Sequence, residues 1–269
     1  MKIKLLVVQL EAIAGDIQGN INKAEKLLSE SNCISADLIL LPELWTIGWD
    51  CEHFNEFCES ITASKFAEFL KRIAIKYNAN VIGGSSILRK NNEKDRNTSL
   101  IYNRKGKLVA TYDKYHLFSH RGESEGTFLE EGTNGLLLNT DIGKIGVSIC
   151  YDIRFPELFR MYAFNGADII VNMAAWPQSF ANEYDTLAKA RAIENQTYFI
   201  SSCLTGKIND MYNFSGNSQI IDYRGKTVIK LDYEEKVISA EIDLDEMRLY
   251  RQQMPILSDT KAQYKIMEK

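Results

Sequence analysis

Histidine and proline are scarce in this chain of 269 residues, which has three histidines and four prolines. Cys51 and His53 lie close together, but no second pair of ligands stands at the spacing of a zinc site. We therefore expect no metal ion. Because proline is rare and glycine is spread along the chain, no long linker is evident, and we expect residues 1–269 to form a single domain.

Cysteine is present, but without any pattern of pairing. The five cysteines are an odd number, and no two of them form a CxxC pair. In a chain with no other sign of secretion, this count argues against a disulfide framework. Most of these thiols are therefore expected to be packing or surface groups.

An excess of charge of one sign and a long apolar run are also absent. The net charge is −4 and the sequence pI about 5.6, which gives no basic bias toward nucleic acid or an anionic membrane. No stretch approaches the roughly 20 apolar residues of a membrane span. The run from Leu5 to Val8 is too short for a signal peptide and is interrupted by Gln9. We expect a first β-strand here and a cytoplasmic protein with no nucleic-acid or membrane partner.

What the sequence does contain is an alternation of helix-like and strand-like segments. Amphipathic spacing or capping residues predict helices. These are residues 20–31, 64–78, 156–166 and 182–196. Apolar runs predict strands, and tight turns join some of them into hairpins. The runs are residues 2–10, 36–43, 79–88, 97–103, 135–150, 167–175 and 198–204. Hairpins among βα units indicate an α/β protein with mixed sheets.

Three chemically reactive side chains follow three different predicted strands. Glu43 follows "LILLP", Lys114 follows "LVATYD", and Cys150 follows "KIGVSI". Because sites in open α/β folds form at the carboxyl ends of strands, these residues can meet at one rim. A thiolate there would attack a carbonyl, the carboxylate would take the thiol proton, and the ammonium would stabilise the oxyanion. Singly, each has a simpler explanation, namely packing for the cysteine and solvation for the charged residues.

Four motifs change that balance. "LPELWTIGWD", "DKYHLF", "ICYDIRFPEL" and "KARAIENQTYFI" occur in this order, and together they resemble the nitrilase, or carbon–nitrogen hydrolase, superfamily. The likeness extends from Gln9 to about Pro255. It implies an αββα four-layer sandwich with two mixed β-sheets, and it maps the catalytic triad of the superfamily onto Glu43, Lys114 and Cys150.

The resemblance also implies a second glutamate between the lysine and the cysteine, which orients the lysine. The segment "GESEGTFLEEG" offers several candidates. The interval to Gly132 favours Glu125, and Glu123 is the alternative. His116 could serve as the base of a Cys–His dyad, but Glu43 and Lys114 explain the arrangement without it, so we interpret His116 as structural.

Further residues are candidates for substrate binding. Tyr151 is expected to contribute its backbone N–H to an oxyanion site, and Arg154 either binds a substrate carboxylate or fixes the turn through Asp152 or Glu157. Met173 and Ala174 are predicted to line the pocket. Trp176 and Phe118 are candidates too, although aromatic residues of this kind more often belong to the core or rim. Arg191 and Glu194, at helical i,i+3 spacing, are interpreted as a supporting ion pair.

The function implied by the resemblance is a cofactor-independent thiol hydrolase. It would cleave the C–N bond of a small non-peptide amide through a cysteinyl thioester, releasing ammonia and a carboxylic acid. The omega-amidase branch is the most similar, which favours an omega-amide of a 2-oxo dicarboxylic acid such as 2-oxoglutaramate. One departure is Ala175, which stands where many relatives have asparagine.

Alternative functions remain open from the sequence. Within the superfamily these are an N-carbamoyl amine hydrolase and a short aliphatic amidase. From other classes they are a non-catalytic scaffold, which the intact Glu, Lys and Cys argue against, and a metal-dependent phosphoesterase, which would need Asp/His clusters. By analogy with the superfamily we expect a homodimer.

Overall fold

The computed structural model describes residues 1–61, 64–89, 94–120, 124–207, 213–261 and 267. In that part of the chain, the first sheet has the strand order β16–β1–β2–β4–β6–β5–β3, and β7 pairs with β6. Its strands are β1 (Lys2–Gln9), β2 (Leu38–Leu40), β3 (Glu59–Ser60), β4 (Asn80–Ile82), β5 (Ser86–Arg89), β6 (Arg96–Tyr102), β7 (Leu108–Asp113) and β16 (Lys236–Asp243). The sheet is mixed, because β1, β2 and β4 are parallel while β16 and β6 run antiparallel to their neighbours.

The second sheet has the order β15–β14–β11–β10–β9–β8. Its strands are β8 (Leu136–Thr140), β9 (Gly143–Ile149), β10 (Ile169–Ala174), β11 (Tyr198–Cys203), β14 (Gln219–Ile221) and β15 (Thr227–Lys230). Strands β9, β10 and β11 are parallel, so this sheet is mixed as well. A short pair, β12 (Thr205–Lys207) and β13 (Asn213–Ser215), lies outside both sheets.

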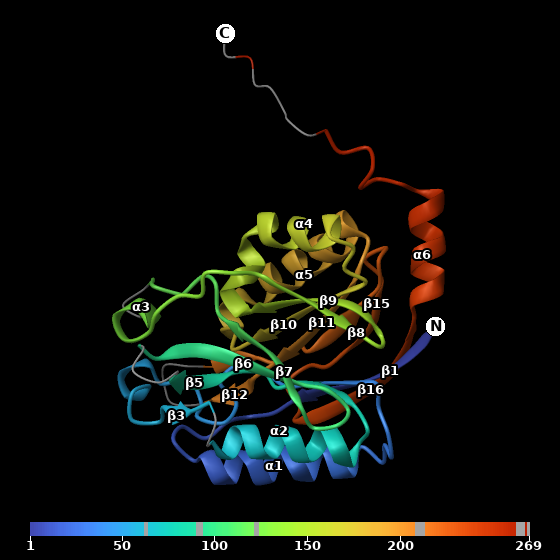
Figure 1. Cartoon of the computed structure of the whole chain (residues 1–269). Helices are drawn as coiled ribbons and strands as arrows, with labels where there is room; N and C mark the ends of the chain where they lie inside the picture. The colour runs from blue at the N-terminus through green and yellow to red at the C-terminus, as the bar shows by residue number, and fades with distance from the viewer. Residues whose placement is uncertain (62–63, 90–93, 121–123, 208–212, 262–266, 268–269) are drawn as a thin grey trace.

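Helices cover the outer sides of the two sheets and lie at their ends (Figure 1). They are α1 (Ile17–Glu30), α2 (Lys65–Lys76), α3 (Glu125–Phe128), α4 (Pro156–Phe164), α5 (Ala181–Asn195) and α6 (Leu244–Gln253). Figure 1 shows α1 and α2 on one side of the two sheets and α4 and α5 on the other. The αββα sandwich predicted from the resemblance is therefore confirmed.

The apolar run of β1 is continuous because both faces of this strand are buried. Leu5 and Val7 belong to the core between the sheets, whereas Leu6 and Val8 pack in the core that α1 and α2 cover. The two-residue period of a strand places alternate side chains on opposite faces. Such strands read as unbroken hydrophobic runs, which is what made β1 recognisable in the sequence.

Several predicted boundaries were wrong. Residues 79–88 form two strands, because the chain turns at Gly83 and Gly84 before β5. The first helix begins at Ile17 and is capped by the Asp16 side chain, which accepts from the Gly19 N–H, so Asn20 is not its cap. The sequence reading missed α3 and α6. Within the described residues, no helix is both long and apolar enough to cross a membrane.

Candidate active site

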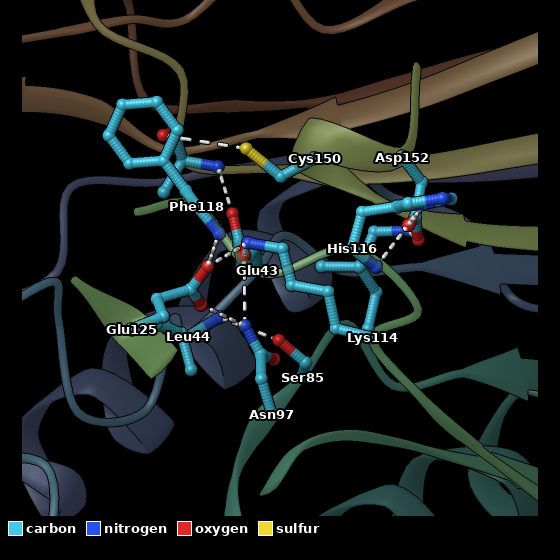
Figure 2. A network of polar contacts seen from close by, with 12 residues as sticks. Glu43, Leu44, Ser85, Asn97, Lys114, His116, Phe118, Glu125, Cys150 and Asp152 are labelled. Atoms are coloured by element: carbon cyan, nitrogen blue, oxygen red, sulfur yellow. Dashed lines mark hydrogen bonds and ion pairs between the residues drawn. The ribbon is translucent and has the colours of Figure 1, made fainter. Parts of the chain in front are cut away.

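Glu43 lies in the loop that follows β2, and a close approach between two loops positions it. The Leu44 N–H donates to the Ser85 Oγ at 3.1 Å, and Leu44 itself has a positive φ of 49°. A Cβ atom at Gly84 would lie 1.9 Å from the Pro42 carbonyl oxygen. Only glycine therefore allows the two loops to pack this closely, and the Glu43 side chain points toward Lys114 (Figure 2).

Lys114 follows β7 and lies between two carboxylates (Figure 2). Its Nζ is 2.9 Å from the Glu43 Oε1 and 2.7 Å from the Glu125 Oε2, and all three side chains are buried. Glu125 is the first residue of α3, and its Oε2 also accepts from the Phe118 N–H at 2.6 Å. The structure therefore brings Glu43, Lys114 and Glu125 together, as the sequence analysis expected. Glu123 lies outside the described residues.

The electrostatics of this cluster follow from two acids sharing one base. Burial alone would lower the pKa of Lys114, but the charges of Glu125 and Glu43 outweigh burial and hold that pKa well above its usual value. Burial raises the pKa of Glu125, against the opposing charge of Lys114.

Cys150 is the first residue of the 3-10 turn η2 (Cys150–Arg154), directly after β9. Its φ is +45°, a conformation that costs a residue with a side chain about 1–3 kcal/mol. The thiol is 5% exposed and donates to the Ala175 carbonyl oxygen, with 3.8 Å between the heavy atoms. Burial and the Glu43 charge raise the pKa of the thiol, while Lys114 opposes them. In the resting site the thiol is therefore protonated.

Asp152 holds the turn that carries Cys150. Its carboxylate is fully buried and accepts from the Ile149 N–H at 2.9 Å and the Tyr112 hydroxyl at 2.7 Å. It also accepts from the His116 N–H at 2.9 Å and contacts the His116 Nδ1 at 2.8 Å. The His116 ring stacks on Phe155 with 3.7 Å between ring centroids. His116 thus contacts the carboxylate that holds the cysteine turn and is not among the residues that line the pocket.

A pocket of about 750 Å³ opens in front of the cysteine. Its lining residues are Trp49, Phe118, His120, Cys150, Tyr151, Arg154, Ala175, Trp176, Pro177, Gln178, Ser179, Phe180, Asn213 and Phe214. Four of the predicted substrate contacts are among them, namely Phe118, Tyr151, Arg154 and Trp176. The lining is mostly aromatic and apolar, which suits a small organic molecule.

Arg154 lies at this pocket with a partner that the sequence analysis did not consider. Its Nη2 donates to the Glu183 Oε2 at 2.6 Å, and its guanidinium lies 5.0 Å from the centre of the Trp176 ring. The two acids named as partners from the sequence were Asp152 and Glu157. Asp152 instead holds the cysteine turn, so that part of the prediction was wrong.

Met173 and Ala174 are not among the residues that line the pocket. Both are fully buried within β10, in the core between the layers. The residues that reach the pocket are Ala175 and Trp176, which follow β10 along the chain. The prediction that Met173 and Ala174 line the pocket was therefore wrong, because an apolar run does not reveal where strand pairing stops.

Several residues of the site were missed. Trp49 lies within the first quoted motif, and its ring centre is 5.4 Å from the Lys114 Nζ. Asn97 lies in β6 and donates to both glutamates. Ala175 was noticed only for the side chain it lacks, yet its backbone N–H donates to the Glu43 Oε2 at 2.8 Å.

Within the described residues, no group of three or more His, Cys, Asp or Glu side chains could hold a metal ion.

Comparison with known families identifies this arrangement. A model of the carbon-nitrogen hydrolase family matches residues 4–252. The chain belongs to the carbon–nitrogen hydrolase family. It is a hydrolase acting on carbon–nitrogen bonds other than peptide bonds, and the family predicted from the four motifs is confirmed.

Similar proteins cover nearly the whole carbon–nitrogen hydrolase chain. It is 34% identical to a 2-oxoglutaramate amidase of Bacillus subtilis, over 96% of this chain and 98% of that protein. It is 31% identical to an omega-amidase of Saccharomyces cerevisiae, over 95% and 92% of the two chains. The crystal structure of a Saccharomyces cerevisiae member of branch 10 of the nitrilase superfamily superposes with a TM-score of 0.86, at 30% identity and 95% coverage of each chain.

Proposed function

We propose that this hydrolase is an omega-amidase that releases ammonia from the amide of a small 2-oxo dicarboxylic acid, of the 2-oxoglutaramate type. The proposal is carried by the contact of Lys114 with both Glu43 and Glu125 beside the Cys150 turn. The relatives named 2-oxoglutaramate amidase and omega-amidase support the substrate class.

The first half-reaction forms a thioester. The Cys150 proton passes to the Glu43 carboxylate as sulfur bonds to the amide carbon, and the carbonyl electron pair moves to oxygen. Lys114 and the Tyr151 backbone N–H stabilise that oxyanion. The intermediate collapses, the C–N bond breaks, and the proton held by Glu43 goes to the leaving nitrogen, so that ammonia departs.

The second half-reaction returns the enzyme to its resting state. Water enters in place of ammonia, and Glu43 takes one of its protons as the oxygen bonds to the thioester carbon. The C–S bond then breaks, sulfur recovers the proton from Glu43, and the carboxylic acid leaves. Glu125 keeps Lys114 in place throughout, because it contacts the ammonium and not the thiol.

An ammonia-release screen tests the substrate class. The panel contains 2-oxoglutaramate, glutamine, an N-carbamoyl amine, a short aliphatic amide and a nitrile. We expect the highest kcat/KM for 2-oxoglutaramate. A preference for the carbamoyl amine or the aliphatic amide would replace the proposed substrate with one of those alternatives, and an enzyme inactive on every compound would contradict the function itself.

Arg154 is proposed to pair with the distal carboxylate of the substrate. One of its five donors goes to Glu183, and the guanidinium fork suits a carboxylate. We expect Arg154→Ala to lower kcat/KM for 2-oxoglutaramate about 10- to 100-fold relative to an uncharged amide of equal length, since a hydrogen bond to a charged group contributes about 1.5–3 kcal/mol. Steady-state kinetics on the two amides measures this ratio.

Glu183→Gln is the matched control for Arg154, because it keeps the cation and removes only its protein partner. It should preserve the preference for the charged amide. If Arg154→Ala lowers kcat/KM equally for both amides, Arg154 supports the pocket wall and does not recognise the carboxylate.

We further propose, from the family resemblance, a cytoplasmic single-domain protein that assembles as a homodimer. Exposed apolar side chains on the outer helices α4 and α5, namely Met161, Phe164 and Ile193, support an interface on that layer. Light scattering of the purified chain should give twice the mass of 30.7 kDa, and a monomer would contradict the dimer.

A further inference from the structure

The amide of Asn97 joins the two carboxylates of the site. Its Nδ2 donates to the Glu43 Oε1 at 2.9 Å and to the Glu125 Oε1 at 3.2 Å. Lys114 contacts the same two residues, through the Glu43 Oε1 and the Glu125 Oε2. The four side chains therefore close a ring in which two acceptors alternate with two donors (Figure 2).

The orientation of the amide follows from its surroundings. The Asn97 side chain is fully buried, and its Oδ1 has no hydrogen-bond partner in the described part of the structure. Exchanging Oδ1 and Nδ2 would place an oxygen against two carboxylates, which breaks both hydrogen bonds to the glutamates and replaces them with repulsion. A buried amide that leaves its own oxygen unpaired in order to donate twice is placed for its donors.

The ring determines which oxygen of Glu43 faces the cysteine. The Oε1 accepts from both Lys114 and Asn97, whereas the Oε2 accepts from the Ala175 N–H. The carbonyl oxygen of the same Ala175 accepts from the Cys150 thiol. The backbone of Ala175 thus contacts both the Glu43 Oε2 and the Cys150 thiol.

We propose that Asn97 is a positioning residue that ties the Oε1 of Glu43 to Glu125 and so presents the Oε2 as the proton acceptor for Cys150. Its two hydrogen bonds also partly neutralise the carboxylates, which reduces their opposition to a thiolate. This inference rests on the proposed amidase mechanism for the role of Glu43, but the contacts themselves do not depend on the identity of the substrate.

Steady-state kinetics of Asn97→Ala tests this role. A Glu43 free to rotate loses the geometry of proton transfer, so we expect kcat to fall about 10²-fold while KM changes little. The acid limb of the pH–rate profile should move to higher pH, because a carboxylate that loses a donor holds its proton to higher pH. Asn97→Asp, which keeps the shape but adds a third carboxylate facing Glu43 and Glu125, should lose more activity than Asn97→Ala.

Ser99→Ala is the matched control. Ser99 is two residues further along β6, is fully buried, and has an Oγ without a hydrogen-bond partner in the described residues. Its kcat and pH profile should match those of the wild type. If Asn97→Ala lowers only the melting temperature or the fraction of active sites, with kcat per active site and the pH profile unchanged, Asn97 is merely structural and the proposal is overturned.

Alkylation by iodoacetamide separates this inference from the amidase proposal. The rate of Cys150 alkylation is measured at pH 8, and the labelled peptide is identified by mass spectrometry. This rate should be lower in Asn97→Ala than in the wild type, because less neutralised carboxylates disfavour the thiolate. If alkylation is slower in Asn97→Ala but the wild type hydrolyses no amide, the amidase proposal is contradicted and the role of Asn97 is retained. An unchanged alkylation rate in Asn97→Ala would contradict the proposed role of Asn97, whichever substrate the enzyme uses.

Discussion

Cys150→Ala should abolish amide turnover while leaving the protein folded. Without sulfur no thioester forms, and loss of a nucleophile of this kind lowers kcat by a factor of at least about 10⁴ in comparable enzymes. The fold should persist because alanine tolerates the positive φ of +45° as well as cysteine does, and the change removes only one buried atom. Ammonia release measures the activity, and circular dichroism with thermal melting measures the fold.

Cys150→Ser sharpens the same test. A serine hydroxyl fits the site but is much harder to ionise than a thiol, so this variant should be nearly inactive. Cys33→Ala is the matched control, since the Cys33 thiol contacts Ser239 and lies outside the pocket lining. Appreciable turnover by Cys150→Ala would rule out the thioester route.

The contact between Glu43 and Lys114 was predictable from the sequence for a physical reason. Strand ends are visible as the points where apolar runs stop, and parallel strands bring such points to one rim. Glu43, Lys114 and Cys150 each follow such a run, and the motifs around them made a chance arrangement implausible. Glu125 could be named only through the resemblance, because α3 has four residues and no periodic pattern.

Residues inside strands were not predictable in the same way. Asn97 is the second residue of β6, and its position depends on pairing with β7, where Thr98 lies opposite Asp113. That register brings the Lys114 N–H to the Asn97 carbonyl oxygen at 2.9 Å. A turn between two strands indicates a hairpin, but the residues of β6 do not show which of them will face the site, so Asn97 reads as an ordinary polar strand residue until the sheet is assembled.

Ala175 illustrates a different limit. From the sequence it is conspicuous only for lacking the amide side chain that many relatives carry. In the structure its backbone matters, because the N–H donates to the Glu43 Oε2 and the carbonyl oxygen accepts from Cys150. Every residue except proline carries both a backbone N–H and a backbone carbonyl group. Their contribution to a site therefore follows from the path of the chain and not from residue identity.

Glu43→Gln should lower activity strongly at every pH. Lys114, Asn97 and the Ala175 N–H all donate to Glu43, so the amide NH₂ of glutamine must face at least one donor. We expect this mismatch to lower the free energy of unfolding by about 1–3 kcal/mol. Loss of the proton acceptor should lower kcat by about 10²–10⁴-fold in the molecules that remain folded.

Glu43→Gln should increase the reactivity of the Cys150 thiol toward iodoacetamide, although it lowers amide hydrolysis. The Glu43 charge helps to raise the pKa of the thiol, whereas Lys114 lowers it. Removing the negative charge while keeping the ammonium should therefore lower that pKa and speed iodoacetamide alkylation of Cys150 at pH 8. A cysteine that is more reactive toward iodoacetamide yet does not hydrolyse amides would show that the missing step follows ionisation of the thiol, at proton transfer to the leaving nitrogen or at activation of water. If Glu43→Gln instead merely shifts the pH optimum, with kcat largely retained, then Glu43 contributes charge and another group is the base.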